Sequence, residues 1–149
     1  MFQPKNILVP TDFSEDSYQA LKVALDIAGK YRSRVFLLHV IDGSVRQCVA
    51  DYCLDWSVVE RIGNESVIFS NEKLKETIEK IQIPEGIKII PDVRNGFPYE
   101  EILREAAQRK VDLIVIASHG KTGLKKYFMG SVAEKVTKEA RCPVLLIRN

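Results

Sequence analysis

The chain has 149 residues, 46% of them hydrophobic and 28% charged, which is typical of one globular domain with a sizeable core. Its formal net charge of +2 gives no indication of a nucleic-acid-binding surface. No apolar run approaches the roughly 18 residues of a membrane-spanning helix, and the first residues show no export signal, so we expect a cytoplasmic protein without a membrane or nucleic-acid partner.

Apolar runs and amphipathic segments alternate along the chain. The runs are short, which predicts strands, whereas the other segments repeat their apolar residues every three to four positions, which predicts helices. Ser14 is suited to cap the first helix, and Pro98 to occupy the first turn of a later one. The predicted elements are, in chain order, strand 6–10, helix 14–31, strand 35–41, helix 64–81, strand 87–93, helix 98–109, strand 113–116, helix 131–140 and strand 144–147.

Residues 42–63 show no clear period and predict at most a short helix. They contain Cys48 and Cys53, whose spacing is wider than that of a CxxC redox motif. The third cysteine, Cys142, is distant in sequence. An odd number of cysteines in a chain without an export signal predicts free thiols.

The alternation of strands and helices predicts a three-layer α/β/α sandwich in a single domain, residues 1–149. Its centre is a five-stranded parallel sheet of Rossmann-like type with helices on both faces. Pro91 lies within the strand predicted at 87–93, which favours an edge position for that strand. In such sheets ligands bind beyond the carboxyl ends of the strands, where the strand order reverses.

Three strand ends therefore carry the candidate binding residues. They are Pro10-Thr11-Asp12, Val40-Ile41-Asp42 and Ala117-Ser118-His119-Gly120. After the third, Gly120 and Gly123 allow close backbone approach to an anion, and nearby lysines supply positive charge.

A helix pattern opens after that loop, at Gly130-Ser131. A helix N-terminus offers unpaired N–H groups to phosphate, and this one includes the amides of Gly130, Ser131 and Val132. Ser131 with Glu134 also fits a capping box, which uses only part of that hydrogen-bonding capacity. The sequence therefore predicts a nucleotide-binding protein.

Two common nucleotide motifs do not fit. A Walker A loop ending in Gly120-Lys121-Thr122 would need a glycine where Val115 stands, inside a strand. The dinucleotide fingerprint GxGxxG should follow the first strand, but residues 10–14 contain no glycine. The remaining pattern is a long loop with a glycine at each end, Gly120 and Gly130.

With this pattern the chain resembles the universal stress protein family, over nearly its whole length. The resemblance rests on Ile7-Leu8-Val9-Pro10-Thr11-Asp12-Phe13-Ser14, Leu38-His39-Val40, Gly96-Phe97-Pro98, the spacing from Gly120 to Gly130-Ser131, and Val144-Leu145-Leu146-Ile147-Arg148. Nucleotide-binding members carry one more glycine, three residues before the position of Gly120, where this chain has Ala117. Alanine there costs about 1 kcal/mol or more if the backbone has a positive φ, and little if it is extended.

The resemblance implies an adenine nucleotide alpha-hydrolase-like fold and an ATP site, with ADP or AMP as alternatives. Asp12 and the Val40 backbone would hold the adenosine, with Pro10, Thr11 and Gly96 nearby. Gly120, Gly130, Ser131 and Val132 would hold the phosphates, with Ala117, His119 and Gly123 in the same loop region. A Mg or Mn ion would be held by phosphate oxygens and by no protein side chain. The resemblance also implies a homodimer formed through residues Val144–Ile147, an apolar run suited to an exposed sheet edge.

Several alternatives stay open. Asp12 is also a good helix-capping residue, and Lys125 and Lys126 also fit a solvated turn. His119 has no acidic partner beside it in sequence, so we assign no catalytic residue. The favoured hypothesis is a nucleotide-dependent regulatory dimer of the stress response, and the others are a slow ATPase and a nucleotide-independent interaction module.

Overall fold

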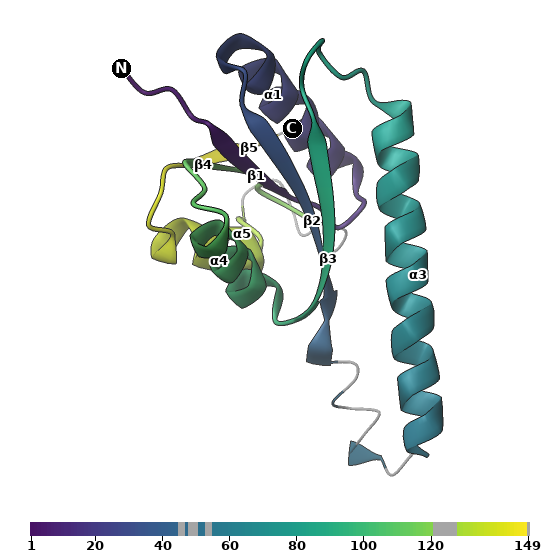
Figure 1. The fold of residues 1–149 in the computed structure, drawn as a ribbon. Coiled ribbons are helices and arrows are strands. Elements are labelled where there is room, and N and C mark those ends of the chain that lie inside the picture. Colours follow the sequence, from purple (N-terminus) through teal and green to yellow (C-terminus); the bar gives the residue numbers. More distant parts are fainter. Residues whose placement is uncertain (45–46, 48–50, 53–54, 121–127, 149) are drawn as a thin grey trace.

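Five parallel strands form one sheet, in the order β3-β2-β1-β4-β5, in the computed structural model of this chain (Figure 1). The strands are β1 (Asn6–Pro10), β2 (Arg34–Asp42), β3 (Ile89–Gly96), β4 (Leu113–Ala117) and β5 (Val144–Ile147). The structure describes residues 1–44, 47, 51–52, 55–120 and 128–148. The predicted parallel sheet is confirmed, and the strand that contains Pro91 is at one edge with β5 at the other.

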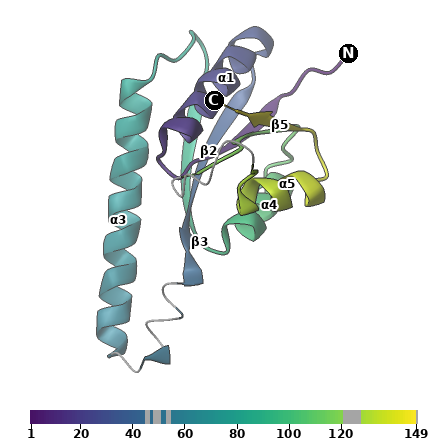
Figure 2. The same cartoon turned by 180° about the vertical axis from the view of Figure 1, so that it is seen from behind.

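Helices cover both faces of the sheet, as the three-layer prediction required (Figures 1 and 2). They are α1 (Glu15–Tyr31), α3 (Trp56–Lys80), α4 (Pro98–Gln108) and α5 (Ser131–Glu139). Side chains of α1 and α3 join one buried cluster with alternate residues of the strands, and side chains of α4 and α5 join the other. Strand residues buried on both faces explain the almost uninterrupted apolar runs of β1 and β4.

The start predicted for the helix at 64–81 is wrong, because α3 begins at Trp56. Its C-terminal part packs on the sheet through Leu74 and Ile78. The N-terminal part extends past the sheet in Figures 1 and 2, and Trp56 and Ile62 are exposed there whereas Val59 is buried. A single buried apolar residue creates no repeated spacing in the sequence, which is why residues 56–63 are not predicted as part of this helix.

Helix α5 begins at Ser131, as predicted, but its cap differs from the prediction. Gly130, and not Ser131, is the N-cap residue, and no side chain among the described residues caps the helix start. The Glu134 carboxylate instead binds Lys138 one turn later, at 2.6 Å. The expected capping box of Ser131 and Glu134 is therefore absent, so the Ser131 hydroxyl has no capping role.

An ion pair with a buried carboxylate connects the end of β3 to α4. Glu105 is fully buried and pairs with Arg94 of β3 and, at 2.9 Å, with Arg109. Gly96 ends β3 with a φ of 150°, and a Cβ there would lie 3.0 Å from the Glu101 side chain. These contacts fix where α4 begins, with Pro98 as its first residue, as predicted.

Two further predictions concern the chain as a whole. Within the described ranges, every helix is too short or too polar to traverse a bilayer. Cys142 is a free, half-buried thiol, and burial followed by the charge of Asp112 raises its pKa. Cys48 and Cys53 lie outside the described residues.

Candidate nucleotide-binding site

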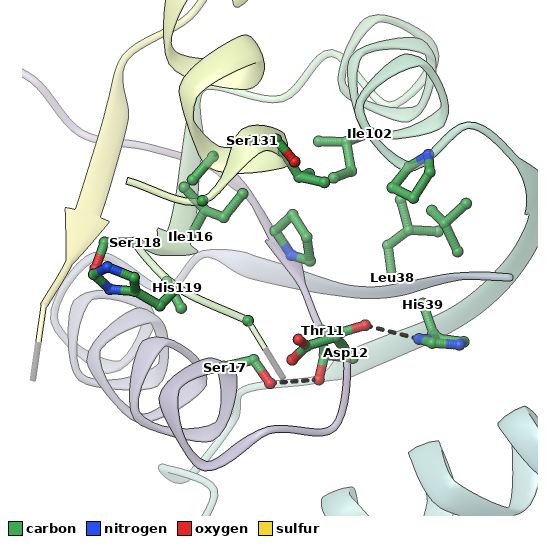
Figure 3. A pocket seen from close by; sticks show the side chains of 18 of the residues that line it. Thr11, Asp12, Ser17, Leu38, His39, Ile102, Ile116, Ser118, His119 and Ser131 are labelled. Carbon is green, nitrogen blue, oxygen red and sulfur yellow. Dashed lines mark hydrogen bonds between the residues drawn. The ribbon is translucent and has the colours of Figure 1, made fainter. Parts of the chain in front are cut away.

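A pocket of about 380 Å³ opens where the strand order reverses, between the carboxyl ends of β1 and β4 (Figure 3). This is the place at which parallel α/β sheets bind ligands. The predicted site residues that line it are Pro10, Thr11, Asp12, Val40, Ala117, His119, Gly120, Gly130, Ser131 and Val132. Gly96 does not line the pocket, and Gly123 lies outside the described residues.

The turn after β1 is held in place from two sides. The Thr11 N–H donates to the Leu38 carbonyl at 2.8 Å, and its hydroxyl is 3.0 Å from that of Ser17 in α1. The Thr11 carbonyl lies 2.8 Å from Nδ1 of His39, so that nitrogen carries the proton and donates (Figure 3). His39 thus anchors the turn, with its ring stacked on Phe13 at 4.3 Å between centroids.

Asp12 connects this turn to the loop after β4. Its Oδ1 accepts hydrogen bonds from the N–H (3.0 Å) and the hydroxyl of Ser14, the residue that caps α1. Asp12 therefore orients the cap, and Ser14 itself accepts from the helix. A Cβ on Gly120 would lie only 2.4 Å from Asp12 Oδ2, so glycine at 120 permits the two segments to meet. The next residue, Phe13, has a φ of 64°, a conformation that a non-glycine residue adopts at some cost.

The backbone conformation of Ala117, at the end of β4, decides whether alanine is costly in place of the motif glycine. Ala117 is the last residue of the strand, is 8% exposed, and is not among the described residues with a positive φ. Its backbone is extended, so alanine in place of the motif glycine carries little conformational cost.

Ser118 links the pocket to the edge of the sheet. Its N–H donates to the Ile147 carbonyl of β5 at 2.8 Å, and its carbonyl accepts from the Gly130 N–H at 2.7 Å. Its hydroxyl lies 2.8 Å from Nδ1 of His119, whose ring lies beside Ser118 in Figure 3. Nε2 of His119 is buried and has no hydrogen-bond partner among the described residues.

The N-terminus of α5 supplies the hydrogen-bond donors of the pocket. The first three N–H groups of a helix have no acceptor within the helix, and here these belong to Ser131, Val132 and Ala133, all of which line the pocket. The Gly130 N–H is already used by Ser118, so this expected phosphate-binding amide is not available. The backbone at Gly130 packs closely on this turn, because a Cβ there would lie 3.2 Å from the Ser118 carbonyl oxygen.

Apolar side chains form the other part of the pocket, on the side of β2 and α4. Asp42 and Ser118, candidates as members of strand ends, line the pocket as well. The described lining residues that sequence reasoning did not assign are Ser17, Leu38, His39, Pro98, Ile102, Ile116 and Ala133. Pro98 and Ile102 are four residues apart in α4, so they share one face of that helix. An apolar pair four residues apart, at the first turn of a helix that follows an edge strand, is the sequence signal that could have identified Pro98 and Ile102.

Two carboxylates contribute the formal charge of the described lining, Asp12 and Asp42. Lysines and arginines are absent from this described part, and Lys121, Lys125 and Lys126 lie outside the described residues. No group of three or more metal-ligating side chains occurs in the part of the chain that the structure describes. Chemically, the pocket offers backbone donors for an anion, apolar walls for a flat ring, and carboxylates as acceptors.

Comparison with known proteins identifies the relatives of this chain. The sequence model of the universal stress protein family matches residues 4–148. Two curated universal stress proteins of Methanocaldococcus jannaschii are similar to this chain. MJ0531 is 36% identical, over 97% of this chain and 82% of that protein. MJ0577 is 37% identical, over 97% of this chain and 94% of that protein. The solved structure of MJ0577 matches with a TM-score of 0.84 and 33% identity, over 99% of this chain and 98% of that one. A universal stress protein from Archaeoglobus fulgidus in complex with dAMP has the same fold, with a TM-score of 0.56 and 21% identity, over 99% of this chain and 100% of that one.

Proposed function

This chain belongs to the universal stress protein family, and we propose that it is a nucleotide-dependent regulatory protein that binds ATP, or ADP or AMP, in the pocket between β1 and β4. The observation that carries the proposal is the start of α5. Three residues whose N–H groups have no intrahelical acceptor line the pocket there, and no side chain in the described part of the chain caps them. Such groups bind phosphate through hydrogen bonds and through the partial positive charge of the helix end.

The rest of the pocket supports an adenosine group. Leu38, Val40, Pro98 and Ile102 provide apolar walls for a base. Asp12 lies between these walls and the loop that starts at Gly120, where its carboxylate is suited to accept hydrogen bonds from ribose hydroxyls. The known binding of dAMP by a protein of the same fold agrees with this assignment.

The proposal includes a homodimer formed through β5 and a cytoplasmic location. The Ser118 residue hydrogen-bonds both to Gly130 in the pocket and to Ile147 in β5, so the site and the proposed dimer edge share one residue. A Mg or Mn ion would be held by phosphate oxygens. The pocket residues would orient the nucleotide, and the bound nucleotide would be read by a partner.

The sharpest test adds a carboxylate to the phosphate end of the pocket. Glutamate is favourable in the first turn of a helix, so Ser131→Glu should preserve the fold while it repels phosphate. We expect the wild-type protein to bind ATP saturably, and the variant to bind ATP at least about tenfold more weakly while it keeps its affinity for adenosine. Isothermal titration calorimetry measures both affinities.

The control is Ser57→Glu, which places the same carboxylate in the first turn of α3, away from the lining residues. It should bind ATP like the wild type. No saturable binding of ATP, ADP or AMP by the wild-type protein at millimolar concentration would refute the proposed function. Equal loss of ATP and adenosine in Ser131→Glu would contradict the assigned phosphate end.

A further inference from the structure

The far end of β2 places a carboxylate at the end of an apolar row. Side chains two residues apart on a strand point to the same face, so Leu38, Val40 and Asp42 form one row. Leu38 and Val40 pack in the cluster beneath α4 and α5, and Asp42 follows them as an exposed residue that still lines the pocket. A flat ring lying on the two apolar side chains would therefore present its outer edge to Asp42.

The orientation of the ligand follows from the proposed function, on which this inference rests. Phosphate at the N-terminus of α5 lies on the β4 side of the pocket, and β2 lies on the other side of β1. The base must then extend toward β2 and the first turn of α4, where Pro98 and Ile102 complete the apolar wall.

One carboxylate oxygen of Asp42 already accepts a hydrogen bond within the protein. Its Oδ1 accepts a hydrogen bond from the Ser44 N–H at 2.9 Å, which fixes the side chain in a local turn. The second oxygen, Oδ2, is then the atom that the carboxylate can offer to a ligand. An ionised carboxylate only accepts hydrogen bonds, so it fits a ring edge that carries a donor and repels one that carries a carbonyl oxygen.

We propose that Asp42 is a specificity-determining residue that selects purines with an amino group at C6 over purines with an oxygen there. Adenine carries a donor amino group at this position, whereas guanine and hypoxanthine carry an acceptor oxygen. Oδ2 of Asp42 accepts from the amino group of adenine and meets the oxygen of the other two unfavourably.

The test is the affinity of the whole chain for ATP, for ITP and for the triphosphate of 6-unsubstituted purine riboside, measured by titration calorimetry at pH 7. In the wild type we expect ATP to bind about tenfold more tightly than either analogue. In Asp42→Asn, the amide oxygen keeps the bond from Ser44 and the amide nitrogen replaces Oδ2. The acceptor thus becomes a donor, so the variant should lose the preference for ATP and bind ITP at least as well.

The matched control is Asp26→Asn, which makes the same change of charge at an exposed position of α1 that does not line the pocket. It should keep the wild-type ratio of ATP to ITP affinity. Equal affinity of the wild type for ATP and ITP, or an unchanged ratio in Asp42→Asn, would overturn the role of Asp42 while the proposed function stands. No binding by the wild type of any of the three nucleotides, nor of ADP or AMP, would overturn both.

Discussion

At the scale of single residues, the contact between Asp12 and Gly120 joins the two loops that form the pocket. The Asp12 carboxylate is held by Ser14 through Oδ1, so it cannot swing away without loss of those bonds. Its other oxygen lies where a Cβ on residue 120 would be. Glycine at 120 is therefore required by a neighbour, and a positive φ plays no part in that requirement.

Gly120→Ala should destabilise the protein by about 1–3 kcal/mol, because the new methyl group forces Asp12 from its place. The cost should fall to less than half in an Asp12→Ala background, where the carboxylate is gone. Urea unfolding of the two single variants and the double variant measures this coupling. If the changes in the free energy of unfolding of the two single variants add up to that of the double variant, the methyl group at position 120 and the Asp12 carboxylate do not interact.

At the scale of elements, α3 starts with a charged cap, Asp55, in an exposed stretch of the chain. The Asp55 carboxylate accepts from the Ser57 N–H at 3.0 Å, and this hydrogen bond, followed by one with the Ser57 side chain, lowers the pKa of Asp55 below its ordinary value. A lowered pKa in the folded state means that the cap contributes stability above the ordinary pKa. That contribution is lost as the pH falls through the folded-state pKa.

The first turn of α3 should therefore fray as the pH is lowered below about 4. Asp55→Asn should remove this pH dependence, because asparagine caps a helix about as well and does not titrate in this range. Amide hydrogen exchange at the first turn of α3, followed by NMR between pH 3 and pH 7, measures the effect. An equal response to acid in both proteins would mean that Asp55 does not control the start of this helix.

At the scale of the whole molecule, the two edges of the sheet differ. At one edge, β3 is accompanied by α3 and contains Pro91 and charged side chains, all of which discourage pairing with another chain. At the other edge, β5 is an apolar strand whose Leu145 is 36% exposed. This asymmetry favours β5 as the edge through which the proposed homodimer forms.

Leu145→Glu should convert the proposed dimer to a monomer, since a charge on an edge strand opposes pairing with a second copy. Sedimentation velocity measures the change, and circular dichroism should show an unchanged fold. The control is Ile68→Glu, which places the same charge at an exposed apolar position of α3. A wild-type protein that sediments as a monomer, or a Leu145→Glu variant that remains a dimer, would refute this interface.

The strands and most of the helices could be predicted from repeated patterns in the sequence. Buried strands and helices that face the core leave a period, so the parallel sheet, the edge position of the strand with Pro91 and most of the pocket lining followed from the sequence. The order of the strands did not follow from it. The start of α3 did not follow, because the helix extends beyond the sheet and little of that part is buried.

Contacts between distant segments were also invisible in the sequence. Nothing near Ser131 indicates that the Gly130 N–H is taken by the Ser118 carbonyl, which depends on how β4 meets α5. Likewise, the sequence places Asp42 among the strand-end candidates, but its place in the lining depends on the packing of α4 opposite β2. Local patterns specify elements, whereas these details arise from their packing.

The extended backbone at Ala117 has a consequence for comparing members of the family. A position that needs no unusual φ accepts glycine or alanine at little conformational cost, so an exchange between the two leaves the end of the strand as it is. Absence of glycine at this one position is thus a poor criterion for dividing members that hold a nucleotide from those that have lost the ability. Positions 120 and 130, where a side chain would collide with Asp12 or press on Ser118, are the better places to look for that loss.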